Sequence, residues 1–462
     1  MRVLHCKQGI LQIATVILFG DAVLILGQNL NDMQAPDVAA ARDHRFPSVE
    51  ARLKVYLSNW YAPPCPKYED GLIRYMYNRS QGSRYPTLEV HEAPNRGSNS
   101  TTLQLESIVE PDMIFYIDRE TVLDCSVLSK DGTENQTTSK ATRVQARKNM
   151  LMYCQDAVNT LLRAVDHVAW ENESEGDDLP ILIQFGDLKH SHVYGYLSVP
   201  HFKKFRPSTT KKDLDRVTSK ECVNGPRDML STVHDIPNLQ AIVWKLATRR
   251  HFGLLEKVSR EDTPWSLKLN MAIFRGQLTG SRDGFDKDKS DEENCLNLRR
   301  CRLVYTHANS AIVHARLTST RKRLPHTLNG VNLMASSTTI QKLLQYKAII
   351  MLEGNDVASG LKWALLSQSV VLMPPPKHTS WAMEELLEPW VHFIPLNENA
   401  TDVEEKMQWV IDNDEIAQRI SERGTLWMED LVFHPDAADD DRLIQEEMVR
   451  RYRAHFYANA AE

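Results

Sequence analysis

The hydrophobic positions in the second half of the chain form short uninterrupted runs, separated by glycine turns and by segments with helical spacing. The runs KAIIMLEG, SVVLMP and WVHFIPL are typical of strands buried on both faces of a parallel sheet. A short helix is predicted between the first two runs, at 358–366, and a second helix, TSWAMEELLE, between the last two. This order predicts a βαβαβ unit with a tight turn at 354–356.

Two further runs predict strands that end in polar residues. NMAIFRG ends with Arg275 and Gly276, and PILIQFGD, in the first half, ends at Asp187. Apolar residues at helical spacing predict a helix at 143–169, before the second of these strands. Because strands alternate with helices, the sequence predicts a doubly wound α/β architecture with parallel sheets.

The length of 462 residues exceeds one ordinary hydrophobic core, so we expect two α/β domains. A boundary near residue 240 gives domains at 61–240 and 241–440, with a last amphipathic helix at 441–462. Basic residues followed by an apolar stretch at 1–27 predict a signal peptide or a signal anchor, and the lack of a small-residue cleavage motif favours the anchor. A polar stem is expected at 28–60.

Composition limits the compartment and the partners. The formal net charge of -6 argues against a nucleic-acid partner. Asn-x-Ser/Thr triplets occur at Asn78, Asn99, Asn135, Asn172 and Asn399, which is consistent with the secretory pathway, although chance could supply most of them. Up to three disulfides with open connectivity are expected among Cys65, Cys125, Cys154, Cys222, Cys295 and Cys301. We therefore expect a protein of the endoplasmic reticulum or Golgi lumen that contacts the membrane only through its N-terminal segment.

The turn at Gly354 is the first candidate binding site. Parallel α/β sheets bind ligands beyond the carboxyl ends of their strands, where glycine turns and helix N-termini present backbone N–H groups to phosphate. Asn355 follows the glycine, and Ser359 and Lys362 belong to the predicted helix. These four residues are predicted to contact a phosphate group, although Lys362 equally fits a solvated position.

The loop after NMAIFRG is the second candidate. The Arg275 guanidinium suits bidentate contact with a diphosphate, Gly276 allows a close approach of the backbone, and Thr279 adds a hydroxyl group. A surface arginine at the end of a strand is the alternative interpretation.

Two carboxylates complete the candidates. Glu384, in the predicted helix TSWAMEELLE, could accept hydrogen bonds from ribose hydroxyls, but acidic residues also favour first turns because of the helix dipole. Asp187 could act as a general base across an interdomain cleft, or cap the next turn.

Other motifs do not predict chemistry. DGFDKDKSDEEN resembles a calcium loop, but Asp291 stands where glycine is required and Asn297 where the bidentate glutamate belongs, so we expect a charged surface loop. His190 and His192 fit ordinary surface histidines better than metal ligands. The missing dinucleotide and P-loop fingerprints argue against a dehydrogenase and a P-loop enzyme.

The segments TPWSLKLNMAIFRGQLTG, YKAIIMLEGNDVASGLKWALLSQSVVLM and EPWVHFIPL resemble, in this order and spacing, glycosyltransferase family 90. This family includes capsule-associated transferases and Rumi-like protein O-glucosyltransferases, and the resemblance spans about 180–430. It implies a GT-B fold, in which two Rossmann-like domains face each other across a cleft. It also implies inverting transfer from a nucleotide sugar, expected to be a UDP-sugar, to a protein or glycan hydroxyl, with no cofactor and no required metal.

For individual residues, the resemblance implies that Arg275 contacts the donor diphosphate and that Asp187 is the catalytic base. The chain departs from Rumi-like members at Gly360, where they have an arginine before the lysine of the helix. This departure keeps a second hypothesis open, namely a catalytically silent relative that binds a sugar or nucleotide. A third hypothesis, another nucleotide-dependent α/β enzyme, lacks the dinucleotide fingerprint.

Overall fold

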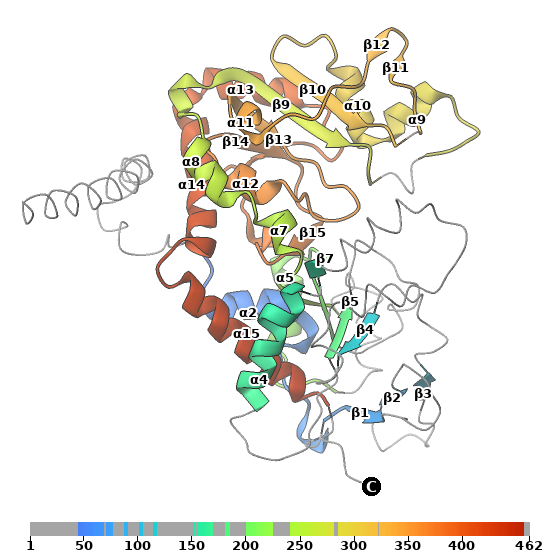
Figure 1. Cartoon of the computed structure of the whole chain (residues 1–462), viewed down its shortest axis with the longest axis vertical. Helices are drawn as coiled ribbons and strands as arrows, with labels where there is room; N and C mark the ends of the chain where they lie inside the picture. The colour runs from blue at the N-terminus through green and yellow to red at the C-terminus, as the bar shows by residue number, and fades with distance from the viewer. Residues whose placement is uncertain are drawn as a thin grey trace, which may run out of the picture.

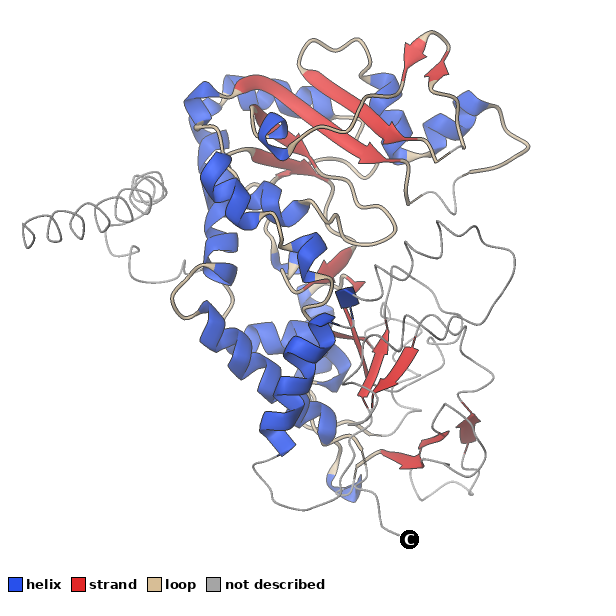
Figure 2. Ribbon diagram, in the orientation of Figure 1, coloured by secondary structure: helices blue, strands red, loops and turns tan. Residues whose placement is uncertain are grey.

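The computed structural model describes residues 45–68, 71–76, 87–90, 101–104, 114–117, 152–153, 155–169, 181–184, 200–224, 241–280, 285–321 and 323–456. The predicted leader at 1–27 and the candidate base Asp187 lie outside these ranges. Within them the chain forms a mixed α/β structure with a five-stranded parallel sheet, so the α/β prediction is confirmed (Figures 1 and 2).

The strands of the described ranges are β1 (Ile73–Met76), β2 (Thr87–Val90), β3 (Thr101–Gln104), β4 (Ile114–Ile117), β5 (Ile181–Gln184), β6 (His201–Lys203), β7 (Phe205–Pro207), β8 (Ala241–Val243), β9 (Leu269–Gln277), β10 (Val313–Ser319), β11 (Thr327–Leu328), β12 (Val331–Asn332), β13 (Tyr346–Ile350), β14 (Val370–Met373), β15 (His378–Ser380) and β16 (Ile394–Pro395).

The helices are α2 (Val49–Leu57), the π-helix η7 (Ala157–Leu162), α4 (Arg163–Ala169), α5 (Lys211–Thr218), α7 (Thr248–His251), α8 (Leu255–Glu261), α9 (Asp291–Asn297), α10 (Arg299–Thr306), α11 (Ile340–Leu343), α12 (Leu361–Leu366), α13 (Val403–Asp412), α14 (Asp414–Val432) and α15 (Ala437–Arg453). The short 3-10 helices are η2 (Ser58–Trp60), η3 (Pro66–Tyr68), η8 (Trp265–Leu267) and η9 (Glu384–Leu386).

The second half is built on a five-stranded sheet in the order β10-β9-β13-β14-β16, in which every neighbouring pair is parallel. This confirms the predicted order of β13, α12, β14 and β16, but the second helix of the predicted βαβαβ unit is replaced by β15 and η9. The chain runs from β9 outward to β10, returns to β13 on the other side of β9, and then runs outward again. The strand order therefore reverses between β9 and β13, which is where open α/β sheets bind ligands.

Side chains alternate between the two faces of this sheet because successive residues of a strand point to opposite sides. Ala272 and Phe274 belong to a cluster with Leu303 of α10 and Met407 of α13. Ile273, between them, belongs to a second cluster that extends into the first half of the chain. Buried apolar residues on both faces explain why the strands show continuous hydrophobic runs in the sequence.

The first half has a smaller sheet in the order β4-β5-β6-β8, with β5, β6 and β8 parallel and β4 antiparallel at the edge. The described part of the predicted strand PILIQFGD is confirmed as β5, Ile181–Gln184. Strands β1, β2 and β3 form a separate antiparallel sheet, and β11 and β12 form a hairpin.

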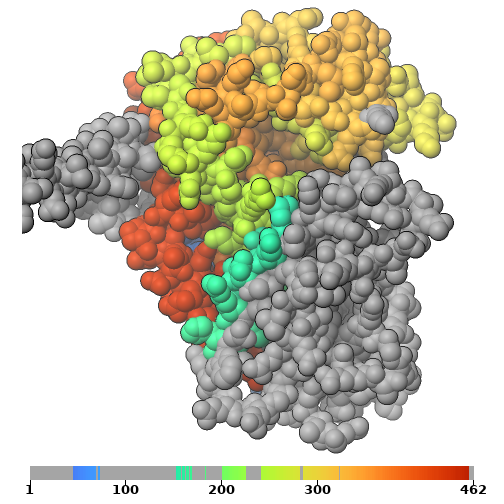
Figure 3. Space-filling model, viewed as in Figure 1, coloured from blue at the N-terminus to red at the C-terminus, as the bar shows by residue number. Residues whose placement is uncertain are grey.

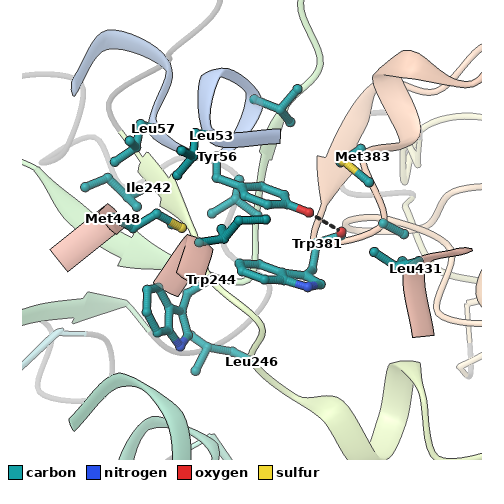
Figure 4. Packing of buried hydrophobic residues seen from close by; sticks show 14 of the residues in the cluster. Leu53, Tyr56, Leu57, Ile242, Trp244, Leu246, Trp381, Met383, Leu431 and Met448 are labelled. Carbon is teal, nitrogen blue, oxygen red and sulfur yellow. Dashed lines mark hydrogen bonds between the residues drawn. The ribbon is translucent and has the colours of Figure 1, made fainter. Parts of the chain in front are cut away.

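One hydrophobic core joins residues from both sides of the boundary predicted near residue 240. The Tyr56 ring of α2 stacks on the Trp381 indole, with centroids 4.2 Å apart and planes 3° from parallel. The Tyr56 hydroxyl donates to the Trp381 carbonyl oxygen at 2.9 Å, and Trp244 lies beside this pair (Figure 4). All three aromatic side chains are fully buried, so this contact fixes the N-terminal helix against the second half.

Two long helices at the end of the chain also connect the halves. Helix α14 packs on α12 and β14, and α15 packs on α2 and α4 of the first half. The red C-terminal segment accordingly runs down one side of the molecule in the space-filling view (Figure 3). Both helices are amphipathic, as their sequences predict.

Two expectations are wrong. The stem predicted at 28–60 includes α2, whose Leu53, Tyr56 and Leu57 are buried in the core. The predicted helix TSWAMEELLE is instead strand β15 followed by the short 3-10 helix η9. Strand β15 pairs antiparallel with β7, and this hydrogen-bonding partner comes from the first half of the chain. A helical pattern in sequence could not reveal a partner so distant.

Two disulfides join described cysteines, Cys65 to Cys222 and Cys295 to Cys301. The first closes a loop with a sequence separation of 157, and the second joins α9 to α10. Among the residues that the structure describes, no helix combines the length and apolar character that crossing a bilayer requires.

Candidate functional site

Two loops meet at the carboxyl edge of the sheet, where the strand order reverses between β9 and β13. The amide of Gly280, after β9, donates to Asn355 Oδ1, after β13, at 3.0 Å. Gly280 has a φ of +78°, and a Cβ there would lie 2.7 Å from the Gly354 carbonyl oxygen. A Cβ on Gly354 would lie 2.5 Å from Thr279 Oγ1. The close contact of the loops therefore depends on glycine at both positions.

Arg300 of α10 fastens the two loops together. Its Nη1 donates to the Gln277 carbonyl oxygen at 2.7 Å and to Thr279 Oγ1 at 2.8 Å, and its Nη2 donates to the Leu352 carbonyl oxygen at 2.6 Å. Burial lowers the pKa of Arg300 to about 10, so the guanidinium stays charged near neutral pH. A cation fixed between two backbone loops favours an anionic ligand beside it.

The loop after β13 is also tied to the first half of the chain. Asp356 is buried, and its Oδ2 lies 2.5 Å from the Nζ of Lys204, a buried residue between β6 and β7. Both partners are nearly inaccessible to water, so the loss of one would leave an uncompensated charge in the interior. This ion pair positions the Gly354 loop against the first half.

His251 is buried near the ammonium groups of Lys204 and Lys362. Neither of its ring nitrogens has a hydrogen-bond partner within the described residues, and the side chain is buried. Burial lowers the pKa of His251 well below its usual value, and the positive charges of Lys362 and Lys204 lower it further. The imidazole is therefore neutral at physiological pH.

The structure brings Lys362 and Glu384 together, but as partners of each other. Lys362 Nζ donates to Glu384 Oε1, and both side chains are essentially inaccessible to solvent. The Glu384 carboxylate also accepts from the Ser380 amide at 2.6 Å and from Ser380 Oγ at 2.8 Å. With these contacts the pair holds α12 against the β15–η9 segment.

Arg275 points away from the two loops, toward the edge strand β10. Its Nη1 donates to the carbonyl oxygens of Phe274 at 2.7 Å and His314 at 2.9 Å, and its Nη2 lies 3.1 Å from His314 Nε2. Burial lowers the pKa of Arg275, and the neighbouring Arg316 lowers it further. No described contact joins Arg275 to the Gly354 loop, so its predicted role in donor binding stays a prediction.

The remaining predicted residues border the loops. Gly276 lies in β9, where a Cβ would be 2.9 Å from the Phe274 ring. Ser359 lies in the turn before α12, a helix of six residues. A hollow with about 10 Å³ of free volume lies alongside, lined in part by Glu353, Pro375 and Glu384. That space holds about one water molecule, so a larger ligand must displace its walls.

Asp187 lies outside the described residues, and its role as base stays a prediction. Among the residues that the structure does describe, no group of three or more His, Cys, Asp and Glu side chains is placed to hold a metal ion. The segment that resembles a calcium loop leads into α9, whose N-cap Ser290 and Glu293 form a capping box.

Sequence reasoning missed Arg300 and Lys204. Lys204 lies within HFKKFRP, a run whose aromatic residues predict burial, and a lysine in such a run signals a buried carboxylate partner. Arg300 carries no comparable signal, because its role depends on how α10 crosses the ends of β9 and β13.

Comparisons with known proteins match the part of the chain that contains both loops. The profile of "Glycosyl transferase family 90" matches residues 248–435, which include both loops. The chain is 39% identical over 268 residues to "O-glucosyltransferase LpsA" of Dichelobacter nodosus, a match that covers 51% of this chain and 74% of that protein. It is 28% identical over 204 residues to "Protein O-glucosyltransferase 2" of Danio rerio, covering 44% of this chain and 36% of that protein. It is 34% identical over 89 residues to "Protein O-glucosyltransferase 3" of Homo sapiens, covering 19% of this chain and 17% of that protein.

Proposed function

Because the chain belongs to glycosyltransferase family 90, we propose that it transfers glucose from a nucleotide sugar, a UDP-sugar, to a hydroxyl group of a glycan or protein acceptor, with inversion at the anomeric carbon. The sugar follows from the names of the relatives, which are O-glucosyltransferases. The enzyme class follows from the family itself.

The observation that carries the proposal is the contact of the Thr279–Gly280 and Gly354–Asn355 loops at the point where the strand order reverses. Glycines there let backbone N–H groups come close to a diphosphate, which is how α/β sheets bind nucleotides. Arg300 adds a fixed positive charge beside these loops. In the proposed donor site, the backbone of the two loops and the Arg300 guanidinium would therefore contact the diphosphate.

In the proposed reaction, the acceptor oxygen forms a bond to the anomeric carbon while the bond from that carbon to the diphosphate oxygen breaks. The acceptor hydroxyl loses its proton to a carboxylate base, for which Asp187 is the candidate. Negative charge grows on the departing diphosphate, and a preorganised cation stabilises that charge in the transition state. Arg300 is held where it can contribute, whereas Arg275 would first have to release its bonds to β10.

We further propose that Lys362 and Glu384 hold the donor site in position without binding the donor themselves. Each is the other's partner in a buried ion pair, and the Glu384 carboxylate also accepts from the Ser380 amide, so we assign both residues a positioning role. Their contacts fix the start of α12 relative to Ser380, and Glu384 itself lines the hollow at the Gly354 loop.

The two α/β lobes are proposed to face each other as in a GT-B enzyme, with the acceptor lying between them. The ladder between β7 and β15 and the Lys204–Asp356 pair support close apposition of the two halves beside the donor loop. The two disulfides support folding in an oxidising compartment such as the secretory lumen.

Purified protein tests the proposal directly. With UDP-glucose, we expect release of UDP and a rise in thermal stability, because a ligand of the native state stabilises it by mass action. The Asp187→Asn variant should bind UDP-glucose normally but lose transfer and donor hydrolysis. Unchanged turnover in this variant would exclude Asp187 as the base, and the absence of binding to any nucleotide sugar would contradict the proposed donor class.

A further inference from the structure

A second and larger hollow lies beyond the carboxyl end of β10, at the same edge of the sheet as the donor loops. This groove has a volume of about 950 Å³, which is near the upper limit for small-ligand sites. Hydroxyl-bearing residues 318–320 form one wall, Leu324 and Met334 supply apolar surface, and Arg321, Arg323 and Asp291 are the lining residues with formal charge. None of the residues proposed to bind the donor lines it.

The groove is physically joined to the donor loops. Arg321 has a left-handed backbone, with φ of 51°, and its Nη2 donates to Gln277 Oε1 at 2.8 Å. The Gln277 carbonyl oxygen accepts from Arg300, which also holds Thr279. A molecule in the groove would therefore lie next to the loop that we assign to the donor diphosphate, on the side of β9 opposite to β13.

The groove is lined by more basic than acidic residues, although the chain as a whole is acidic. The whole sequence has a formal charge of -6, yet two arginines and one aspartate line this surface. Arginine side chains with a planar guanidinium suit carboxylate, sulfate and phosphate groups. The hydroxyl groups at 318–320 and the adjacent apolar surface suit the alternating polar and apolar faces of a sugar ring.

An extended peptide fits this place less well. The outer edge of β10 is occupied at Leu317, near the groove, because the Leu317 amide donates to the Leu333 carbonyl oxygen at 2.8 Å and the Ala335 amide donates to the Leu317 carbonyl oxygen at 2.9 Å. A peptide in the groove therefore cannot pair as a strand with this end of β10.

We propose that this groove binds the acceptor, and that the acceptor is an oligosaccharide with an acidic group that pairs with Arg321 and Arg323. The inference rests on the proposed glucosyl transfer and specifies the acceptor class for it. The two arginines suit a carboxylate, a sulfate or a phosphate alike, since a guanidinium binds all three.

Binding of the full chain to immobilised glycans tests this. The array should hold neutral oligosaccharides and matched versions with uronic acid, sulfate or phosphate groups, together with acidic peptides. We expect wild type to prefer acidic over neutral glycans by about tenfold, with the preference weakened at high salt. The Arg321→Gln/Arg323→Gln variant should lose that preference. The Lys342→Gln/Arg419→Gln variant should keep it, because it removes the same charge at two exposed positions outside the groove.

UDP-glucose binding measured on the same samples distinguishes failure of the acceptor proposal from failure of the donor proposal. If wild type binds UDP-glucose but prefers neutral glycans or acidic peptides, or if the groove variant keeps the preference for acidic glycans, the acceptor assignment is wrong and the donor proposal stands. If wild type binds no nucleotide sugar, the proposed function fails first.

Discussion

Replacing Gly354 with alanine tests whether the two donor loops function as one unit. The added Cβ would lie 2.5 Å from Thr279 Oγ1 and 3.1 Å from Arg300 Nη2. To relieve this overlap, Thr279 must turn away and lose the hydrogen bond that Arg300 donates to it at 2.8 Å. Losing a hydrogen bond to a charged group and overpacking the site together cost about 2–4 kcal/mol.

The same change displaces the loops that we assign to diphosphate binding. We therefore expect the affinity for UDP-glucose to fall by at least about tenfold. Isothermal titration of Gly354→Ala measures this, and chemical denaturation measures the accompanying loss of stability. Gly360→Ala is the matched control in the same segment. A Cβ at Gly360 meets Trp363 Nε1 at 3.1 Å and Met351 Cε at 3.2 Å, and these longer side chains can shift by a few tenths of an ångström. We therefore expect a smaller loss there.

A second variant tests whether the contact between Gly354 and Thr279 controls donor binding. Thr279→Ala removes the oxygen that the new Cβ would meet, leaving the Thr279 Cβ at 3.4 Å, an ordinary contact distance. The Gly354→Ala/Thr279→Ala double variant should therefore bind UDP-glucose better than the sum of the two single effects predicts. Strict additivity, or wild-type affinity in Gly354→Ala, would show that the contact between these loops does not control donor binding.

Three further changes test the packing of the fold. Lys362→Met leaves the Glu384 carboxylate buried without its cation and should lower the free energy of unfolding by about 3–5 kcal/mol, as measured in urea, whereas Lys362→Met/Glu384→Gln should recover part of the loss. Replacing the Cys65–Cys222 pair with serine opens a loop with a separation of 157 and should cost about 5 kcal/mol, seen as a lower Tm; an unchanged Tm would show that the bond does not stabilise the native state. Burial lowers the pKa of His455 from 6.5 to about 4, so the unfolded chain binds the additional proton between these values. Its contribution to stability is therefore present above pH 6.5 and lost as the pH falls toward 4, a change on the order of 3 kcal/mol. His455→Gln should flatten that part of the stability–pH curve, and an identical slope in both proteins would contradict the assignment.

Strands β13 and β14, with helix α12 between them, could be predicted because both strands are buried on both faces. KAIIMLEG and SVVLMP therefore show uninterrupted apolar runs, and they form β13 and β14 in adjacent parallel register. The segment between β14 and β16 could not be predicted in the same way. TSWAMEELLE has the local pattern of a helix, but its first residues pair with β7 and Trp381 packs on Tyr56, both of which lie far away in sequence.

The candidate site was predictable to a similar extent. Thr279, Gly354 and Asn355 could be found because glycine-containing turns after buried strands indicate ligand loops, and the structure brings them together. The partners that hold these loops could not be inferred from spacing. Arg300 reaches them from a helix on one face of the sheet, and Lys204 from the other half of the chain.

Hydrogen exchange of the wild-type chain with and without UDP-glucose tests the central claim most directly. We expect slower exchange for backbone amides of 278–280 and 352–357, the two loops that meet where the strand order reverses, with little change elsewhere in the second half. Saturating UDP-glucose that protects other segments and leaves both loops unchanged would contradict the assignment of the donor site.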